Sequence, residues 1–327
     1  MQPLDMRLGF GLTELTMDSI EDDISEYFEQ VVKEEKELDH DGEVSSWMRE
    51  VGKDDKSMFG ICAVSTRGKV KEGANTTEKF PLESVSKALS FALALEDVGA
   101  DKVFEHVGKE PRGDSFNSVA AVENEQPGIP SNPMINAGAI VCTSLIKGRN
   151  GEERYTRLRD FIRKLAGNDQ LDYNHEMFAA EEKDLNRALF YFMRSHDIVS
   201  GSEEDSLLPY MKQTSIEMNC VDLARIAAVL ANAGKAPGSD EQLISPENLR
   251  IVLTLMFTTG IYEASGAYAV DVGIPSKSGI SGAILAVVPG RMGLSTIGPA
   301  LDESGNSIAG VRMLGKLAQR WHLGSFA

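Results

Sequence analysis

The sequence has few cysteines and no apolar stretch that could cross a membrane. Its three cysteines, Cys62, Cys142 and Cys220, lie far apart in apolar surroundings, which predicts buried thiols rather than disulfides or a metal site. No run approaches the roughly 18 apolar residues of a membrane-spanning helix. Residues 1–7 lack the basic region and the apolar core of a signal peptide, so a cytoplasmic protein is expected.

Basic residues and histidines are also scarce. Lysine and arginine total 33 against 50 aspartates and glutamates, and the resulting net charge of −17 repels phosphate backbones and anionic membrane surfaces. Neither nucleic acid nor a membrane is therefore expected as a partner. The five histidines include no His-x-x-x-His pair, so the sequence predicts no structural zinc, no catalytic metal and no cofactor.

The chain is long and apolar enough for a packed core, with 327 residues of which 42% are hydrophobic. Strand-like segments occur near both ends, at residues 59–65 and 69–74 and again at 268–274, 282–288 and 293–297. The first two form a predicted hairpin, and one hairpin cannot stand alone. We therefore expect one mostly antiparallel sheet built from both chain ends.

Helical signals fill the chain between these strands. Residues 83–257 are predicted to be an inserted all-helical domain, while 1–82 and 258–327 form the α/β sheet domain, with the active site at their interface. Residues 111–133 read as a loop because they contain four prolines. The other helices are expected at residues 18–38, 97–107, 155–166, 184–193, 221–233, 245–257 and 307–321.

The most informative stretch contains Ser84 and Lys87 at the predicted start of a helix, where both side chains share one face. A serine hydroxyl becomes a good nucleophile only when a base takes its proton, so the lysine must be neutral at working pH. Lowering a lysine pKa from ~10.4 to about 7 costs about 4 to 5 kcal/mol, which requires burial or a second cation nearby. Free N–H groups at the helix N-terminus could receive an oxyanion.

Ser144 and Lys147 repeat the same spacing and provide a comparison within the chain. Lys147 is followed by Gly148-Arg149-Asn150-Gly151, which is typical of a helix end. Water and the negative end of the helix dipole would keep that lysine charged. Of the two motifs, only the one at Ser84 is predicted to be catalytic.

A second motif supports this interpretation. Lys277-Ser278-Gly279 precedes the predicted strand 282–288, and a Ser-x-x-Lys followed by a Lys-[Ser/Thr]-Gly is typical of the active-site-serine acyl enzymes related to β-lactamases. Lys277 could be the second cation that Lys87 requires. The two motifs together predict an acyl-transfer site.

The surrounding sequence resembles the serine-dependent glutaminases of this superfamily, which hydrolyse free L-glutamine to L-glutamate and ammonia. The resemblance implies a serine β-lactamase-like fold of the α/β (α+β) class, with a mostly antiparallel sheet flanked by helices plus an all-helical domain. It also implies a homo-oligomer, as a homodimer or homotetramer. The matching segments are residues 82–87, 93–99, 116–119, 132–140, 186–189, 260–262, 275–279, 285–290 and 305–307.

The resemblance also assigns roles to individual residues. Ser84 would be the nucleophile and Lys87 its base, with Lys277 beside them, and the N–H groups of Ser84 and Ile280 would form the oxyanion hole. The residues that would hold the glutamine, with Tyr262 also at the catalytic centre, are Asn136, Asn186, Tyr210, Tyr262 and the backbone of Ile280.

The chain departs from the family pattern at two positions. Trp47 stands where the family has a catalytic tyrosine, and an indole cannot shuttle a proton. The family's glutamate for the substrate ammonium lies seven residues before Asn186, but Ala179 occupies that position. A two-residue deletion would bring Glu181 into the place of that glutamate, although an ordinary helix-start carboxylate is an equal interpretation of Glu181.

Two other functions remain open on the sequence alone. The same Ser84, Lys87 and Lys277 could serve another amidase or a β-lactam-binding acylase. The chain could also be a non-catalytic glutamine-binding or scaffold relative that has kept the fold and lost the tyrosine.

Overall fold

A computed structural model describes residues 17–38, 41–50, 52, 55–111, 128–180 and 184–326. Within these ranges, no helix combines the length and the apolar composition needed to cross a membrane. The three cysteines are buried free thiols, as the sequence predicted.

Five antiparallel strands form the central sheet, and their order across it is β2-β1-β7-β6-β5. Strand β1 of the first hairpin pairs with β7 from the C-terminal part, so the expected sheet built from both chain ends is present. The strands are β1 (Gly60–Ser65), β2 (Val70–Ala74), β5 (Ser276–Ser278), β6 (Ala283–Val288) and β7 (Met292–Ile297).

Helices cover both faces of this sheet. Ile61 and Ala63 of β1 belong to the core under α1 (Met17–Lys36) and α15 (Ile308–Trp321), whereas the intervening Cys62 and Val64 belong to the core under α12 (Cys220–Ala231). This alternation follows from the two-residue period of a strand. Helix α12 packs so closely on β7 that a Cβ atom added at Gly293 would lie 2.1 Å from the Ala228 nitrogen. Only glycine leaves room for this contact.

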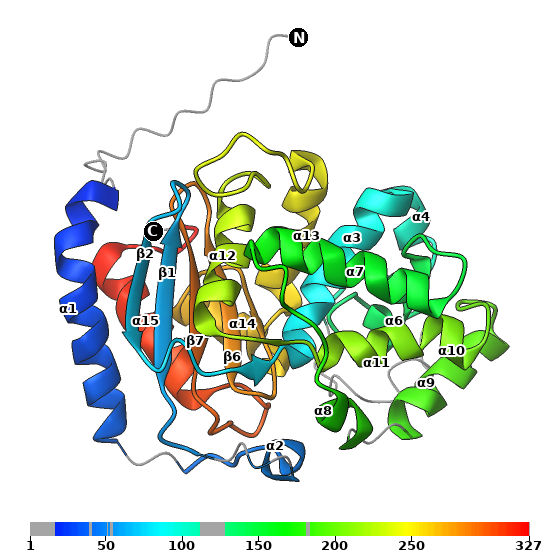
Figure 1. The fold of residues 1–327 in the computed structure, drawn as a ribbon, viewed down its shortest axis with the longest axis horizontal. Coiled ribbons are helices and arrows are strands. Elements are labelled where there is room, and N and C mark those ends of the chain that lie inside the picture. The colour runs from blue at the N-terminus through cyan, green and yellow to red at the C-terminus, as the bar shows by residue number, and fades with distance from the viewer. Residues whose placement is uncertain are drawn as a thin grey trace.

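The other large group of helices lies on the side of the sheet away from α1 (Figure 1). Its central member is α3 (Ser86–Val98), which is buried continuously from Ser86 to Leu95. Two short strands, β3 (Phe80–Pro81) and β4 (Glu217–Met218), pair with each other beside it. The remaining helices are α4 (Ala100–Phe104), α6 (Asn136–Leu145), α7 (Gly151–Ala166), α8 (His175–Ala180), α9 (Asp184–Ser195), α10 (Glu203–Ser206), α11 (Leu208–Thr214) and α13 (Pro246–Thr259).

One predicted strand is wrong. The segment 268–274 lies mostly in a helix, α14 (Ser265–Asp271), in which Tyr268 packs into the core while Val270 is 85% exposed. The short stretch did not show whether its apolar residues alternate or follow a helical period. The edge strand is instead β5, so Lys277 and Ser278 lie on a strand of their own. The division of the chain into two domains at 82/83 and 257/258 stays a prediction.

Candidate active site

Ser84 lies in a short 3-10 turn, η1 (Glu83–Val85), directly before α3. The Ser86 hydroxyl donates to the Glu83 carbonyl oxygen at 2.7 Å and closes the turn. Glu83 has a φ of +48°, a left-handed conformation that residues with a side chain rarely adopt. Ser84 is buried in this turn, with 6% of its surface exposed.

Lys87 is fully buried one turn after Ser84. Burial lowers the pKa of Lys87 to about 7, and the nearby Glu83 carboxylate acts in the opposite direction. Lys147, in the second motif, is exposed, and its partner Ser144 donates to the Val141 carbonyl oxygen. The two motifs therefore differ in burial as expected.

Two asparagines from different helices meet at Lys87. Its ammonium donates to Asn136 Oδ1 at 2.5 Å, and Asn136 Nδ2 donates to Asn186 Oδ1 at 3.1 Å. Asn136 begins α6, and Asn186 lies in the first turn of α9. A Cβ at Gly138 would lie 1.9 Å from the Asn132 carbonyl oxygen, so only glycine allows the preceding loop to approach α6 this closely.

Tyr262 bonds with Ser84, and Lys277 lies against its ring. Tyr262 begins the 3-10 turn η2 (Tyr262–Ala264) and donates its hydroxyl to the Ser278 carbonyl oxygen at 3.2 Å. Burial raises the pKa of Tyr262, while hydrogen bonds with Ser84 and Ser278 lower it in part. Lys277 Nζ lies 4.2 Å from the centre of the Tyr262 ring.

Lys277 is as deeply buried as Lys87. Its ammonium donates to the Ser278 carbonyl oxygen at 2.7 Å and to the Gly260 carbonyl oxygen at 3.0 Å. Burial, and after it the charge of Lys87, hold the pKa of Lys277 well below its usual range. Two buried amines that repel each other favour a state in which one of them is neutral.

The loop after β5 packs against the turn that carries Ser84. A Cβ at Gly279 would lie 3.0 Å from the Leu82 carbonyl oxygen and 3.3 Å from a methyl carbon of Val85. Ile280 is the next residue of this loop and is half-buried. The structure thus brings the loop of Ile280 beside Ser84, although the two come from distant parts of the sequence.

For the remaining predicted site residues, the structure shows fewer contacts or does not describe the side chain. Tyr210 is buried in α11, which packs against η1. Glu181 lies outside the described residues. Trp47 belongs to the short helix α2 (Ser46–Glu50), and its side chain is likewise outside the description.

Two residues of the site had not been assigned a role from the sequence. Glu83 affects the pKa of Lys87, and only its position next to Ser84 could have suggested this. Asn306 accepts a hydrogen bond from the Ser278 hydroxyl at 2.6 Å. Asn306 lies in a segment that resembles the family, but the resemblance implied no role for it.

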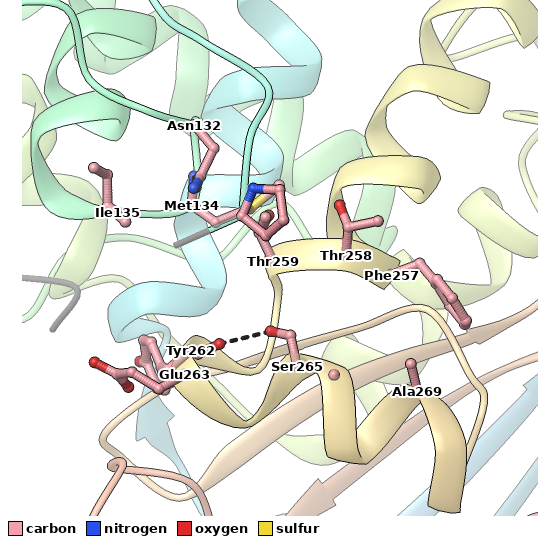
Figure 2. A pocket seen from close by; sticks show the side chains of 12 residues that line it. Asn132, Met134, Ile135, Phe257, Thr258, Thr259, Tyr262, Glu263, Ser265 and Ala269 are labelled. Carbon is pink, nitrogen blue, oxygen red and sulfur yellow. Dashed lines mark hydrogen bonds between the residues drawn. The ribbon is translucent and has the colours of Figure 1, made fainter. Parts of the chain in front are cut away.

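A cavity of about 280 Å³ adjoins Tyr262 (Figure 2). Apolar side chains such as Met134, Ile135 and Phe257 form much of its wall, and Glu263 is the acidic residue among those that line it. The Ser265 hydroxyl donates to the Tyr262 carbonyl oxygen at 2.7 Å along one side. Among the residues that the structure describes, no three histidines, cysteines or acids are grouped to hold a metal ion.

The glutaminase family model matches residues 42–326. The chain belongs to the glutaminase family. A glutaminase from Geobacillus thermodenitrificans is 46% identical over 297 residues, which cover 90% of this chain and 96% of the relative. Glutaminase 2 of Bacillus subtilis is 43% identical over 300 residues, covering 91% of this chain and 97% of the relative. The predicted membership of an amide-hydrolysing enzyme family is therefore confirmed.

Solved glutaminase structures agree with the fold. A Bacillus glutaminase, crystallised at high salt, matches with a TM-score of 0.86 and 34% identity, covering 93% of this chain and all of that one. A probable glutaminase from Bacillus subtilis, complexed with 6-diazo-5-oxo-L-norleucine, matches with a TM-score of 0.84 and 32% identity, covering 93% and 97% of the two chains. These glutaminases confirm the expected serine β-lactamase-like fold.

Proposed function

We propose that the protein hydrolyses L-glutamine to L-glutamate and ammonia through an acyl-enzyme on Ser84. The observation that carries this proposal is the fully buried Lys87, whose pKa of about 7 lets it act as a base one turn from a buried serine. The covalent complex of a related Bacillus subtilis glutaminase with 5-oxo-L-norleucine, an analogue of glutamine in which a methyl ketone replaces the side-chain amide, supports the reaction type.

The reaction proceeds in two halves. Lys87 takes the proton of Ser84, whose oxygen bonds to the side-chain amide carbon, and the carbonyl electrons move onto its oxygen. When the carbonyl re-forms, the carbon–nitrogen bond breaks and the nitrogen leaves as ammonia with a proton returned by Lys87. Water then attacks the acyl ester in the same way, which releases glutamate and restores Ser84.

The N–H groups of Ser84 and Ile280 receive the oxyanion. One such donor typically contributes about 3 kcal/mol to the transition state. We assign the Tyr262 hydroxyl, which bonds with Ser84 and Ser278, the role of passing the proton of Lys87 on to the leaving nitrogen. Lys277 is a second buried amine close enough to feel the charge of Lys87, and whichever of the two amines carries a proton opposes protonation of the other.

Amides and one carboxylate hold the substrate. Asn136 and Asn186 supply amide groups that can bind the α-carboxylate, and Tyr210 lies on the helix next to the Ser84 turn. Glu181 supplies the negative charge for the α-ammonium, because burying an unpaired ammonium costs several kcal/mol. A homodimer or homotetramer and a cytoplasmic location stay predictions.

Removal of the nucleophile tests the centre of this proposal. Ser84→Ala should abolish ammonia release from glutamine, whereas Ser144→Ala should leave it nearly intact, because only Ser84 lies beside a lysine that burial holds near neutral pKa. Ammonia release by both variants tests whether Ser84 is the nucleophile, and circular dichroism shows whether each variant is folded. Equal losses in two folded variants would refute the assignment of Ser84.

The alternative functions require a panel of substrates. Ammonia release from glutamine, asparagine and simple amides, together with mass spectrometry of Ser84 after exposure to penicillin, separates a glutaminase from another amidase and from a β-lactam-binding acylase. A chain that binds glutamine without turnover would be the non-catalytic relative. We expect glutamine to be the preferred substrate and penicillin to leave Ser84 unmodified.

The preference for a substrate with an α-ammonium group is assigned to the Glu181 carboxylate and can be tested by mutation. Glu181→Gln should raise the Michaelis constant for glutamine at least about tenfold, equivalent to 1.4 kcal/mol, with a smaller effect on an amide that lacks the α-amino group. Glu182→Gln is the matched control and should have little effect. If both substrates respond equally to Glu181→Gln, another carboxylate binds the ammonium.

A further inference from the structure

Ser278 is the residue at which several groups of the site meet. Its carbonyl oxygen accepts hydrogen bonds from the Tyr262 hydroxyl at 3.2 Å and from Lys277 Nζ at 2.7 Å. Its N–H donates to the Gly260 carbonyl oxygen at 3.2 Å. Ser278 also directly precedes Gly279, whose backbone packs on the turn of Ser84. A shift of Ser278 would therefore move the tyrosine, the lysine and the loop together.

Asn306 holds Ser278 from the opposite side. Asn306 Oδ1 accepts the Ser278 hydroxyl at 2.6 Å, and Asn306 Nδ2 lies 3.5 Å from the Ile261 carbonyl oxygen, at the outer limit of a hydrogen bond. Ile261 directly precedes Tyr262. Asn306 is fully buried, so water does not compete for either end of its amide.

Asn306 is itself held by its own turn. Its N–H donates to Asp302 Oδ1 at 2.9 Å, and its carbonyl oxygen accepts the Asp302 N–H at the same distance. Gly305 has a φ of +87°, which glycine adopts without strain and which closes the turn. Ser307 then caps α15 by accepting from the Gly310 N–H. The amide of Asn306 thus extends from a closed turn at the start of a long helix.

We infer that Asn306 is a positioning residue, which orients Ser278 and thereby aligns the Tyr262 hydroxyl and Lys277 with Ser84. This inference rests on the proposed function. Ser278 and the Ile261 backbone separate Asn306 from the reacting atoms, so its loss should disturb the alignment of the catalytic groups more than the binding of substrate. The effect is therefore expected in kcat, with little change in KM.

The main experiment replaces Asn306 with alanine. Asn306→Ala should lower kcat for glutamine by about 10- to 100-fold while KM changes less than about threefold, because misplacement of reacting groups by about 1 Å costs rates of this size. Ser278→Ala removes the same hydrogen bond from the other side. If the bond carries the effect, the double variant should lose no more activity than Asn306→Ala alone, whereas independent additive losses would overturn the inference.

Asn232→Ala controls for lost stability. The Asn232 amide likewise makes two hydrogen bonds, to the carbonyl oxygens of Lys235 at 3.2 Å and Ala236 at 3.3 Å, but it does so at the C-terminal end of α12. Its replacement should lower the melting temperature and leave kcat unchanged. An equal fall in kcat for Asn232→Ala and Asn306→Ala would mean that Asn306 has only a structural role.

A second readout does not depend on glutamine. A fluorophosphonate labels activated serines, and mass spectrometry gives its rate of attachment to Ser84. Asn306→Ala should slow this labelling about tenfold or more, since the alignment around Ser84 is disturbed. If the wild-type protein is labelled at Ser84 but releases no ammonia from glutamine, the proposed substrate is wrong. The labelling rates of the wild-type protein and Asn306→Ala then still test the role of Asn306. Equal labelling of both folded proteins overturns the inference.

Discussion

Lys87 derives its chemistry from its surroundings. It is fully buried with a pKa of about 7, whereas Lys147 has the same spacing from a serine but is exposed. Burial disfavours the charged form, because an ammonium loses the solvation of water. The Glu83 carboxylate acts against burial and raises the pKa of Lys87, and Lys277 is a second buried amine whose own pKa is lowered by burial and then by the charge of Lys87.

These two neighbouring charges should shift the pH profile in opposite directions. The value of kcat/KM should rise with pH as Lys87 loses its proton, with a midpoint near its pKa of about 7. Glu83→Gln removes an anion, so the pKa of Lys87 should fall and the midpoint should move to lower pH by about one unit. Lys277→Met removes a cation, so the midpoint should move to higher pH.

Measurement of kcat/KM from pH 5 to 9 checks both directions, and Glu247→Gln serves as a control in the exposed first turn of α13. An unshifted profile for folded Lys277→Met would mean that burial alone sets the pKa of Lys87. A shift to higher pH for Glu83→Gln would contradict the role of its charge.

A buried side chain joins three helices, α3, α6 and α11. Gln213 of α11 donates its amide to the Ser90 hydroxyl of α3 at 3.2 Å and accepts from the Thr143 hydroxyl of α6 at 3.0 Å. These three helices also carry Tyr210, Lys87 and Asn136. Gln213 thus connects the elements that position the predicted substrate-binding and basic groups.

Replacement of Gln213 tests this connection. Gln213→Ala should lower the free energy of unfolding by about 2–3 kcal/mol, because it leaves a cavity and removes two buried hydrogen bonds. Urea denaturation measures the loss. Gln30→Ala, on the exposed face of α1, should cost less than about 0.5 kcal/mol. Similar losses for the two variants would show that the buried network adds little stability.

The whole molecule is organised around a sheet that combines distant parts of the chain. Strands β1 and β7 pair at its centre, while α1 and α15 cover one face. The two helices are also linked by charge: Lys316 Nζ lies 2.9 Å from both Glu34 Oε2 and Glu35 Oε1. Helix α1 precedes the part of the chain that the family model matches, so this link fastens α1 to the matched part.

The difference in burial predicts which of the two glutamates contributes more to the stability of the fold. The Glu35 side chain is fully buried, whereas 44% of the Glu34 side chain is exposed. Glu35→Gln should lower the free energy of unfolding by about 2–3 kcal/mol, because it weakens a buried ion pair. Glu34→Gln should cost clearly less, since water screens that pair. Urea denaturation should show the difference with kcat unchanged in both variants, and a larger loss for Glu34→Gln would contradict it.

Local chemistry was accessible from the sequence alone. The Ser84–Lys87 spacing places both residues on one helix face, and the helices predicted at residues 18–38 and 245–257 are present as α1 and α13. The two motifs and the matching segments were enough to indicate the family and, through it, the fold. Each of these signals depends on residues within a few positions of one another, which a local reading can interpret.

Tertiary structure decided what depends on contacts between distant residues. The strand predicted at 268–274 is the helix α14, because Tyr268 and Val272 pack into the core while Val270 does not. The contact of Asn306 with Ser278 has no local signal, and neither has the approach of Lys277 to Lys87. Solvation and hydrogen bonding act between atoms that are close in space, and only the folded chain brings these atoms together.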